Sequence, residues 1–275
     1  MQKEGAKLLN GIKTIDFSTT SVEDTIIAEE ALQIWINGKP FTVTMRTPGN
    51  DLELIRGLFY TEDIYTDSKP LATRIVEYME AGVPSVINAA IPPALIGPSF
   101  YESRSLMSVS SCGICGKKEW SDQKANLIKL ENSHQIESIL FEDLFEKMKR
   151  RQTLFQETGG CHAAACFDCN GNLLVVMEDI GRHNAVDKAI GALLDSDNLD
   201  NAMIILVSGR ISYEIVSKTY KAKIPFLAAV SSPSSLSIRV ADEMGITLLA
   251  FCRKNSITCY THPERILFPK VRIKK

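Results

Sequence analysis

The segment that decides the fold reads MIILVSGRISYEIVSKTYKAKIPFLAAVSSPSSLSIRVADEMGITLLAF, from Met203 to Phe251. It contains three apolar runs that recur at about the spacing of a βαβ unit, Met203–Val207, Phe226–Val230 and Ile246–Phe251. We expect helical segments around 212–222 and 235–244 between these runs. Strands that are buried on both faces and joined by helical crossovers predict a parallel sheet with right-handed connections.

The part of the chain before this segment has more hairpin signals than crossover signals. Asn37-Gly38 suits a tight primed turn between the alternating runs of residues 32–45. Asn50 or Asp51 could cap a helix over 54–59, and a second hairpin is expected over 163–177. The predicted class is α/β, or α+β overall, in four parts: a loose leader over 1–15, a β-rich α+β domain over 16–110, a mobile cysteine loop and linker over 111–135, and an α/β domain over 136–275.

The composition excludes several classes of protein. A net charge of −2 over 275 residues argues against a broad nucleic-acid surface, which needs an excess of Lys and Arg. No stretch approaches the roughly 20 apolar residues that span a bilayer, and the N-terminus lacks the apolar run of a signal peptide. The 7 cysteines are odd in number and scattered, which does not suggest a disulfide framework. We therefore expect a protein of the reducing cytoplasm.

Two cysteines lie in a short glycine-containing stretch, Cys112-Gly113-Ile114-Cys115-Gly116, which Lys117-Lys118 follows. The glycines leave the backbone permissive, and the lysines favour the thiolate, which is the form that attacks sulfur or binds metal. A Cys-x-x-Cys pair supports redox exchange, half of a zinc site, or the carriage of a sulfane sulfur. The pair alone does not decide among the three.

Each predicted parallel strand ends in a small or cationic loop. The three loops are Ser208-Gly209-Arg210, the serine-rich 231–235 segment and Cys252–Ser256. Ligands of open parallel sheets bind outside the carboxyl ends of the strands, so Arg210, Arg253 and Lys254 could converge on a phosphate-bearing ligand. The alternative is that the serines cap helices and the arginines are solvated. Neither a Walker loop nor a Gly-x-Gly-x-x-Gly motif supports a standard nucleotide site.

A dense polar cluster, residues 178–188, directly follows a predicted strand. If a helix starts near Gly181, His183 and Asp187 share a face at i, i+4. A carboxylate beside a histidine orients its tautomer, as in general-base or metal sites. The alternative is a helix N-terminus stabilised by acidic residues, with a His–Asp pair at the surface.

A zinc site is a further possibility. Cys112 and Cys115 could join Cys166 and Cys169 in a four-thiolate site, with Cys161 or His162 in reserve, although the gap between the pairs is far longer than usual. A deaminase site at His162 fails on chemistry, because the acid/base Glu expected two residues later is Ala164. Cys259 is expected to be structural.

The order of these motifs resembles the FdhD/NarQ-type formate dehydrogenase accessory sulfurtransferases. The resemblance runs from about residue 30 to the C-terminus. Its residues are Cys112-Gly113-x-Cys115-Gly116, Thr158-Gly159 with His162-Ala163-Ala164-Ala165, Glu178-Asp179-x-Gly181-Arg182-His183-x-Ala185-x-Asp187-Lys188, Ser212-Tyr213-Glu214, the 231–235 loop and Phe251-Cys252-Arg253.

The resemblance implies a sulfur carrier. A cysteine desulfurase would supply sulfane sulfur, the Cys112–Cys115 loop would carry it as a persulfide, and the acceptor would be the molybdenum bis-molybdopterin guanine dinucleotide cofactor of formate dehydrogenase. Cys115 could resolve the persulfide or shuttle the sulfur itself. The resemblance also implies a homodimer, no tightly bound catalytic metal, and a C-terminal domain similar to the three-layer cytidine deaminases with a partly parallel sheet.

The resemblance also implies where the cofactor binds. The family's cofactor-contacting loop falls on Phe251, Cys252, Arg253, Lys254, Asn255 and Ser256. We expect further contacts with the cofactor from Arg210, Ser208, Ser231 and His183. A zinc-binding interaction module and a thiol–disulfide oxidoreductase remain the alternative functions.

Overall fold

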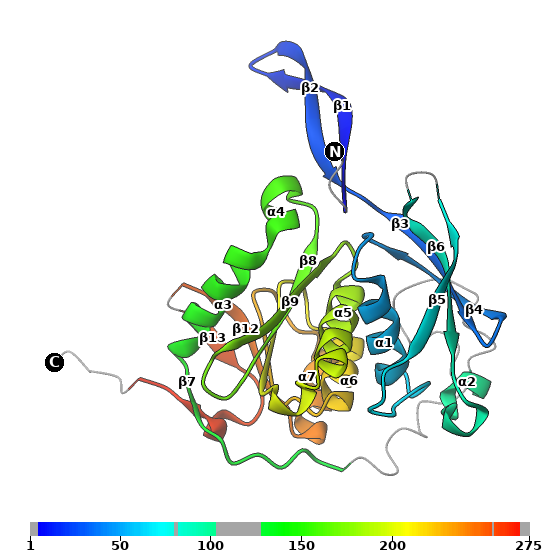
Figure 1. Cartoon of the computed structure of the whole chain (residues 1–275). Helices are drawn as coiled ribbons and strands as arrows, with labels where there is room; N and C mark the ends of the chain where they lie inside the picture. Colours follow the sequence, from blue (N-terminus) through cyan, green and yellow to red (C-terminus); the bar gives the residue numbers. More distant parts are fainter. Residues whose placement is uncertain (1–4, 80–81, 103–127, 255, 270–275) are drawn as a thin grey trace.

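The computed structural model describes residues 5–79, 82–102, 128–254 and 256–269. Cys112, Cys115 and Asn255, which carry part of the predicted site, lie outside these residues. Two larger sheets organise the described chain (Figure 1). One has six strands in the order β13-β12-β11-β10-β8-β9, and the other has four in the order β4-β3-β6-β5.

The six-stranded sheet confirms the expected parallel core. β10 pairs with β11 and β11 with β12 in parallel, and the remaining pairs are antiparallel, so the sheet is mixed. The predicted hairpin over 163–177 is the pair β8–β9. The strands are β8 (His162–Phe167), β9 (Leu173–Asp179), β10 (Ile204–Val207), β11 (Phe226–Ala229), β12 (Thr247–Arg253) and β13 (Ser256–Cys259).

Helices cover both faces of this sheet. Alternate strand residues such as Ile205 and Leu227 pack in one apolar cluster with α5 (Arg182–Asp195), α6 (Tyr213–Lys221) and α7 (Ser235–Met244). Their neighbours, such as Leu206 and Phe226, pack in a second cluster with α3 (Leu140–Arg151). Two buried faces explain why the strands read as continuous apolar runs. The likeness to cytidine deaminases stays a prediction.

The four-stranded sheet contains the first predicted hairpin. β3 and β4 are antiparallel, and the turn residues Asn37 and Gly38 have φ of 50° and 79°. α1 (Asp51–Thr61) packs on this sheet through Leu54, Ile55 and Phe59. Asn50 precedes the helix without a side-chain cap, and Asp51 binds Arg46 instead. The strands are β3 (Glu30–Ile36), β4 (Lys39–Arg46), β5 (Ala72–Tyr78) and β6 (Pro84–Ala90).

Shorter elements complete the described chain. α4 (Thr153–Thr158) follows α3, and β7 (Ile136–Glu137) pairs in parallel with β14 (Ile266–Leu267). The remaining helical turns are η2 (Pro93–Leu95), α2 (Ser99–Glu102), η5 (Leu199–Asn201) and η6 (Pro263–Arg265).

The expectation of a loose leader over 1–15 is wrong. β1 (Ala6–Ile15) pairs antiparallel with β2 (Ser18–Ile27) along its whole length, and this hairpin projects from the body of the protein (Figure 1). Its turn uses Asp16 and Phe17 with φ of 48° and 63°. Neither strand has an apolar face, so the alternation that usually reveals a hairpin is missing.

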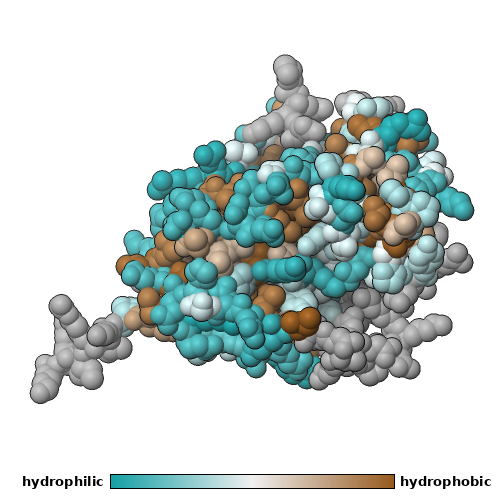
Figure 2. All heavy atoms as spheres, turned by 60° about the horizontal axis from the view of Figure 1, so that its bottom comes forward, coloured by the Kyte–Doolittle hydropathy of each residue, from teal (hydrophilic) through white to brown (hydrophobic). Residues whose placement is uncertain are grey.

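Apolar side chains are scattered over the face of the molecule shown in Figure 2, where small hydrophobic patches lie among hydrophilic residues. Scattered apolar residues are normal on a water-exposed surface and do not mark a binding site. None of the described helices is both long and apolar enough to span a membrane.

The two sheets meet through a close crossing of α1 and α5, which lie side by side between them (Figure 1). Glycines permit this contact. A Cβ on Gly57 would lie 1.8 Å from the carbonyl oxygen of Asp187, and a Cβ on Gly191 would lie 1.9 Å from that of Glu53. No side chain fits between backbones at these distances, so the crossing requires glycine on both helices.

We expect Gly57→Ala to lower the free energy of unfolding by about 1–3 kcal/mol or more, because the methyl group must push the two backbones apart. Gly11→Ala in β1 is the matched control, since its Cβ would meet Val22 at an ordinary 3.7 Å. Urea unfolding of the two variants measures the difference. Equal midpoints for Gly57→Ala and the parent protein would show that the helices are not in contact there.

Candidate functional site

An open groove of about 1510 Å³ lies on the α3 side of the six-stranded sheet and reaches its carboxyl edge. Apolar side chains of α3, such as Phe141, Phe145 and Met148, form one wall. The residues between α4 and β8, including Gly160, Cys161 and His162, form the end near the sheet edge. The groove therefore joins an apolar wall to the polar loops that follow the strands.

Part of the predicted binding set lines this groove. Arg253 and Lys254 are exposed, and Cys252 is buried beside them at the end of β12. Ser208, directly after β10, lies at the same edge because β10 and β12 flank the parallel strand β11. The members in the lining are Ser208, Cys252, Arg253, Lys254 and Ser256.

The other predicted residues lie elsewhere at the same edge. Arg210 is exposed outside the groove lining. Ser231 and Phe251 are neighbours, because the carbonyl of Ser231 accepts a hydrogen bond from the Phe251 amide at 3.2 Å. His183 is buried at the start of α5.

His183 and Asp187 do not form the pair that their spacing suggested. The Nε2 atom of His183 lies 3.2 Å from the Ser212 hydroxyl oxygen and 3.8 Å from a carboxylate oxygen of Glu214. Burial, with Arg182 and Lys218 adding to it, lowers the pKa of His183 to about 4, so its contact with Glu214 is not an ion pair at neutral pH.

Asp187 binds partners from two other helices. Its carboxylate accepts hydrogen bonds from the Thr61 hydroxyl and the Lys218 ammonium, both at 2.9 Å. Burial dominates over these partners and raises the pKa of Asp187 to about 6. The i, i+4 spacing failed as a predictor because a buried carboxylate takes the nearest cation, and that cation comes from α6.

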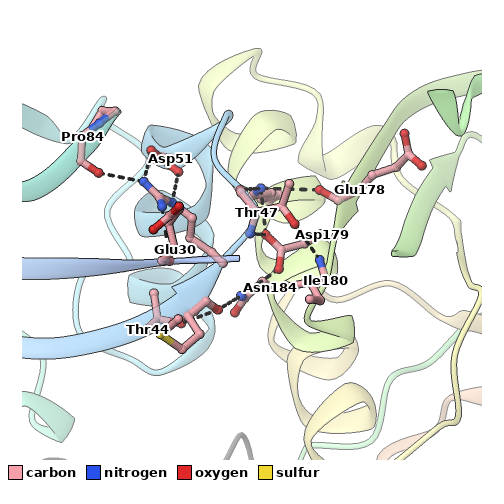
Figure 3. Close-up of polar contacts among 12 residues, drawn as sticks. Glu30, Thr44, Thr47, Asp51, Pro84, Glu178, Asp179, Ile180 and Asn184 are labelled. Carbon is pink, nitrogen blue, oxygen red and sulfur yellow. Dashed lines mark hydrogen bonds and ion pairs between the residues drawn. The ribbon is translucent and has the colours of Figure 1, made fainter. Parts of the chain in front are cut away.

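Asp179, at the end of β9, joins the two sheets (Figure 3). Its carboxylate is fully buried and accepts from Lys188 at 2.8 Å and from the Thr47 amide at 3.1 Å. The Gly181 amide and the Asn184 side chain bind its other oxygen at 2.8 and 3.0 Å. Four donors satisfy the charge, which makes burial of this ion pair tolerable.

Further hydrogen bonds hold the residues at the end of β4 against β9 and α5. Lys188 also donates to the Thr47 carbonyl at 2.9 Å, and the Thr47 hydroxyl accepts from the Ile180 amide at 3.0 Å. The Asn184 amide donates to the Met45 carbonyl at 2.8 Å, and the adjacent Arg46 holds Asp51 at 2.8 and 3.0 Å (Figure 3). Three polar side chains of the 178–188 motif, those of Asp179, Asn184 and Lys188, therefore join the two sheets.

Glu178, the first residue of that motif, organises the groove end. Its carboxylate accepts the Leu154 and Phe155 amides at 2.9 and 2.8 Å, which satisfies the first turn of α4. It also accepts the thiol of Cys161 at 3.3 Å. Burial and this carboxylate raise the pKa of Cys161 to about 12, so the thiol stays protonated at neutral pH.

Three further thiols are likewise held in the protonated form at neutral pH. Burial raises the pKa of Cys166 and of Cys252 to about 12 and that of Cys259 to about 11. Cys259 was expected to be structural, and its half-buried thiol packs against the α3-side cluster. Cys169 is the exposed cysteine among the described residues.

His162 was considered as a reserve metal ligand and as a deaminase residue but not as part of the cofactor site, yet it lines the groove. Its Nδ1 atom lies 3.4 Å from the Ser208 hydroxyl oxygen. β8 runs antiparallel to β10, so the start of one strand meets the end of the other. A predicted β8–β10 pairing would have placed His162 beside Ser208, but an antiparallel neighbour within a βαβ region gives no local signal.

These features define a mixed α+β protein with an open groove and exposed cations at the carboxyl edge of its larger sheet. A family model described as the FdhD/NarQ family matches residues 27–267. The chain is 44% identical to the sulfur carrier protein FdhD of Sulfolobus acidocaldarius, over 92% of this chain and 96% of that protein. It is 40% identical to the sulfur carrier protein FdhD of Mycobacterium tuberculosis, over 88% and 92% of the two chains.

A solved structure supports the fold. The crystal structure of a putative formate dehydrogenase accessory protein from Desulfotalea psychrophila superposes with a TM-score of 0.73, at 21% identity, over 95% of this chain and 99% of that one. The chain belongs to the FdhD/NarQ family, as the motifs suggested.

Because the folded pKa of His183 is near 4 and the unfolded value near 6.5, the unfolded chain binds a proton that the folded protein does not. We therefore expect stability to fall as the pH drops from 6.5 to 4, by up to about 3 kcal/mol at about 1.4 kcal/mol per pKa unit. His183→Gln should flatten this part of the profile in urea unfolding. His134→Gln, at an exposed histidine, should not. Identical profiles for the two variants would contradict a buried neutral His183.

Proposed function

We propose that this protein is a sulfur carrier for formate dehydrogenase. It accepts sulfane sulfur from a cysteine desulfurase as a persulfide on the Cys112–Cys115 pair. It then passes the sulfur to the molybdenum bis-molybdopterin guanine dinucleotide cofactor before that cofactor enters formate dehydrogenase. The homodimer and the cytoplasmic location stay predictions.

The similarity to proteins named as sulfur carriers, at 40–44% identity over most of the chain, is the observation that carries this proposal. The environments of the described cysteines support it. Cys161, Cys166, Cys252 and Cys259 are held as protonated thiols by burial. A carrier needs a thiolate that a partner can reach, and Lys117-Lys118 beside the Cys112–Cys115 pair favour one there.

The sulfur step is a thiol–persulfide exchange. The Cys112 thiolate attacks the terminal sulfur of the donor's persulfide, and a new sulfur–sulfur bond forms on Cys112. The sulfur–sulfur bond of the donor breaks, and the donor cysteine leaves as a thiolate. Electrons balance without an added oxidant, because one thiolate replaces the other. Cys115 can then receive the sulfur or release it by forming a disulfide.

The groove is the proposed binding place for the client cofactor. Arg253 and Lys254 present a guanidinium and an ammonium group, which suit the phosphates of a dinucleotide. Ser208 adds a hydroxyl at the same edge. Arg210 lies outside the lining, so we assign phosphate binding to the two cations that follow β12.

The position of Cys166 argues against it as a ligand in the alternative four-thiolate zinc site. Cys166 lies on β8 with no exposed surface and packs in the apolar cluster beneath α5. A zinc ligand must be a thiolate that reaches the metal, and this thiol is turned into the core with its pKa raised to about 12. A four-thiolate site with Cys112 and Cys115 would require the sheet to open.

Treatment with a cysteine desulfurase and cysteine should add one sulfur, about 32 Da, to the intact protein, because persulfide exchange transfers a single sulfur atom. Cys112→Ala should abolish the gain, which intact-mass spectrometry measures. Cys259→Ala and Cys169→Ala serve as a half-buried and an exposed control, and both should keep the gain. An undiminished gain in Cys112→Ala would refute the assignment.

A further inference from the structure

His162 lies at the groove end beside Ser208, and two hydrogen bonds hold Ser208 against the next residue of β8, Ala163. The Ser208 hydroxyl oxygen accepts the Ala163 amide at 2.9 Å and lies 3.4 Å from Nδ1 of His162. The Ser208 amide in turn donates to the Ala163 carbonyl at 3.0 Å. These bonds extend the β8–β10 pairing by one residue pair. They fix the backbone position from which the His162 side chain leaves β8.

The same bonds favour one tautomer. The Ser208 oxygen already accepts an amide hydrogen, and its own hydroxyl hydrogen needs an acceptor. Nδ1 of His162, at 3.4 Å, can accept that hydrogen. Donation from Ser208 to Nδ1 satisfies both groups and places the ring hydrogen on Nε2. The free N–H then belongs to a side chain that lines the groove.

The surroundings also keep the ring neutral. Burial lowers the pKa of His162, Arg182 lowers it further, and Asp179 opposes them only in part because Lys188 neutralises its charge. Arg253 and Lys254 line the same groove and supply its positive charges. At neutral pH the groove end therefore offers an uncharged N–H donor among cations.

Gly209, which has no side chain, leaves room for the imidazole ring of His162. A Cβ at position 209 would lie 3.2 Å from Nδ1 of His162, 3.3 Å from Cε1 and 3.5 Å from Cβ of Arg182. The two contacts with the ring are tighter than a Cβ normally makes, so a residue larger than glycine would push the imidazole by a few tenths of an ångström. The loop after β10 thus contacts the His162 ring through both Ser208 and Gly209.

We propose that His162 is a ligand-binding residue of the groove, whose Nε2–H donates a hydrogen bond to an anionic group held near Arg253 and Lys254. The anion is either a nucleotide phosphate oxygen or the terminal sulfur of a persulfide. A neutral donor stabilises a persulfide anion without handing it a proton, whereas an imidazolium would protonate it. This inference deepens the proposed function, and its sulfur branch rests on that function.

Nitrogen-15 NMR of the intact protein tests the assignment directly. At neutral pH the His162 signals should be those of a neutral ring with hydrogen on Nε2. Saturating GDP or inorganic phosphate should shift Nε2 if the ligand is a phosphate. Desulfurase-loaded protein should shift it if the ligand is the persulfide. An imidazolium, a ring with hydrogen on Nδ1, or an Nε2 signal that none of the three probes moves would overturn the proposal.

Variants give a second, independent readout. His162→Leu should weaken GDP binding about tenfold for the phosphate source, or shorten the lifetime of the loaded persulfide against cyanide for the sulfur source. His162→Gln, whose amide can replace the lost N–H, should recover most of the effect. His134→Leu is the control at an exposed histidine. Equal values for His162→Leu and the parent protein in both assays would overturn the proposal.

The outcomes separate this inference from the proposed function. A parent protein that takes up no sulfur refutes the sulfur carrier, and the GDP and phosphate measurements then still decide the role of His162. A parent protein that loads sulfur on Cys112, with an Nε2 signal that no probe shifts, keeps the carrier and refutes His162.

Discussion

The buried carboxylate of Asp179 is the constraint on which the rest of the structure depends. It lies at the end of β9, where the larger sheet gives way to α5, and it binds Lys188 and the Thr47 amide from the smaller sheet. An ion pair with almost no exposed surface is stable only if every lone pair and every hydrogen has a partner, because neither charge can be solvated. Asp179 is therefore one of the side chains that fix the two sheets relative to each other.

This junction changes how the polar motif over 178–188 should be interpreted. A cluster of Glu, Asp, Arg, His and Lys after a strand suggests chemistry, yet Asp179, Asn184 and Lys188 join the sheets and Asp187 joins α5 to α6. Glu178 accepts hydrogen bonds from the first turn of α4 and from the thiol of Cys161, and it helps to keep that thiol protonated. The motif serves the ligand site indirectly, since it fixes the start of α5 and keeps Arg182 beside the groove end. The proposed chemistry falls instead on the Cys112–Cys115 pair and on the loops that follow the strands of the larger sheet.

Much of the fold was predictable because local signals agreed with it. The buried runs at 203–251 gave the parallel strands, and Asn37-Gly38 gave a hairpin. Two predictions were wrong for different reasons. One concerned a strand without a hydrophobic pattern, and the other a residue whose partner lies far away in the sequence. β1 has no apolar face, so its pairing with β2 left no periodicity to detect. Asp187 pairs with Lys218, 31 positions later in the chain, and not with His183, one helical turn earlier. At the site, Ser208, Arg253 and Lys254 followed from strand ends, whereas His162 required knowledge of an antiparallel register.

The central claim is that sulfur carriage falls to the Cys112–Cys115 pair because the fold keeps the thiols around the groove protonated and buried. Residue-resolved alkylation of the native protein, with brief exposure to iodoacetamide at neutral pH followed by mass spectrometry, tests it most directly. The account predicts rapid modification of Cys112 and Cys115, and protection of Cys161, Cys166, Cys252 and Cys259 until the protein is unfolded. Modification of Cys161 or Cys252 as fast as that of Cys112 would contradict it.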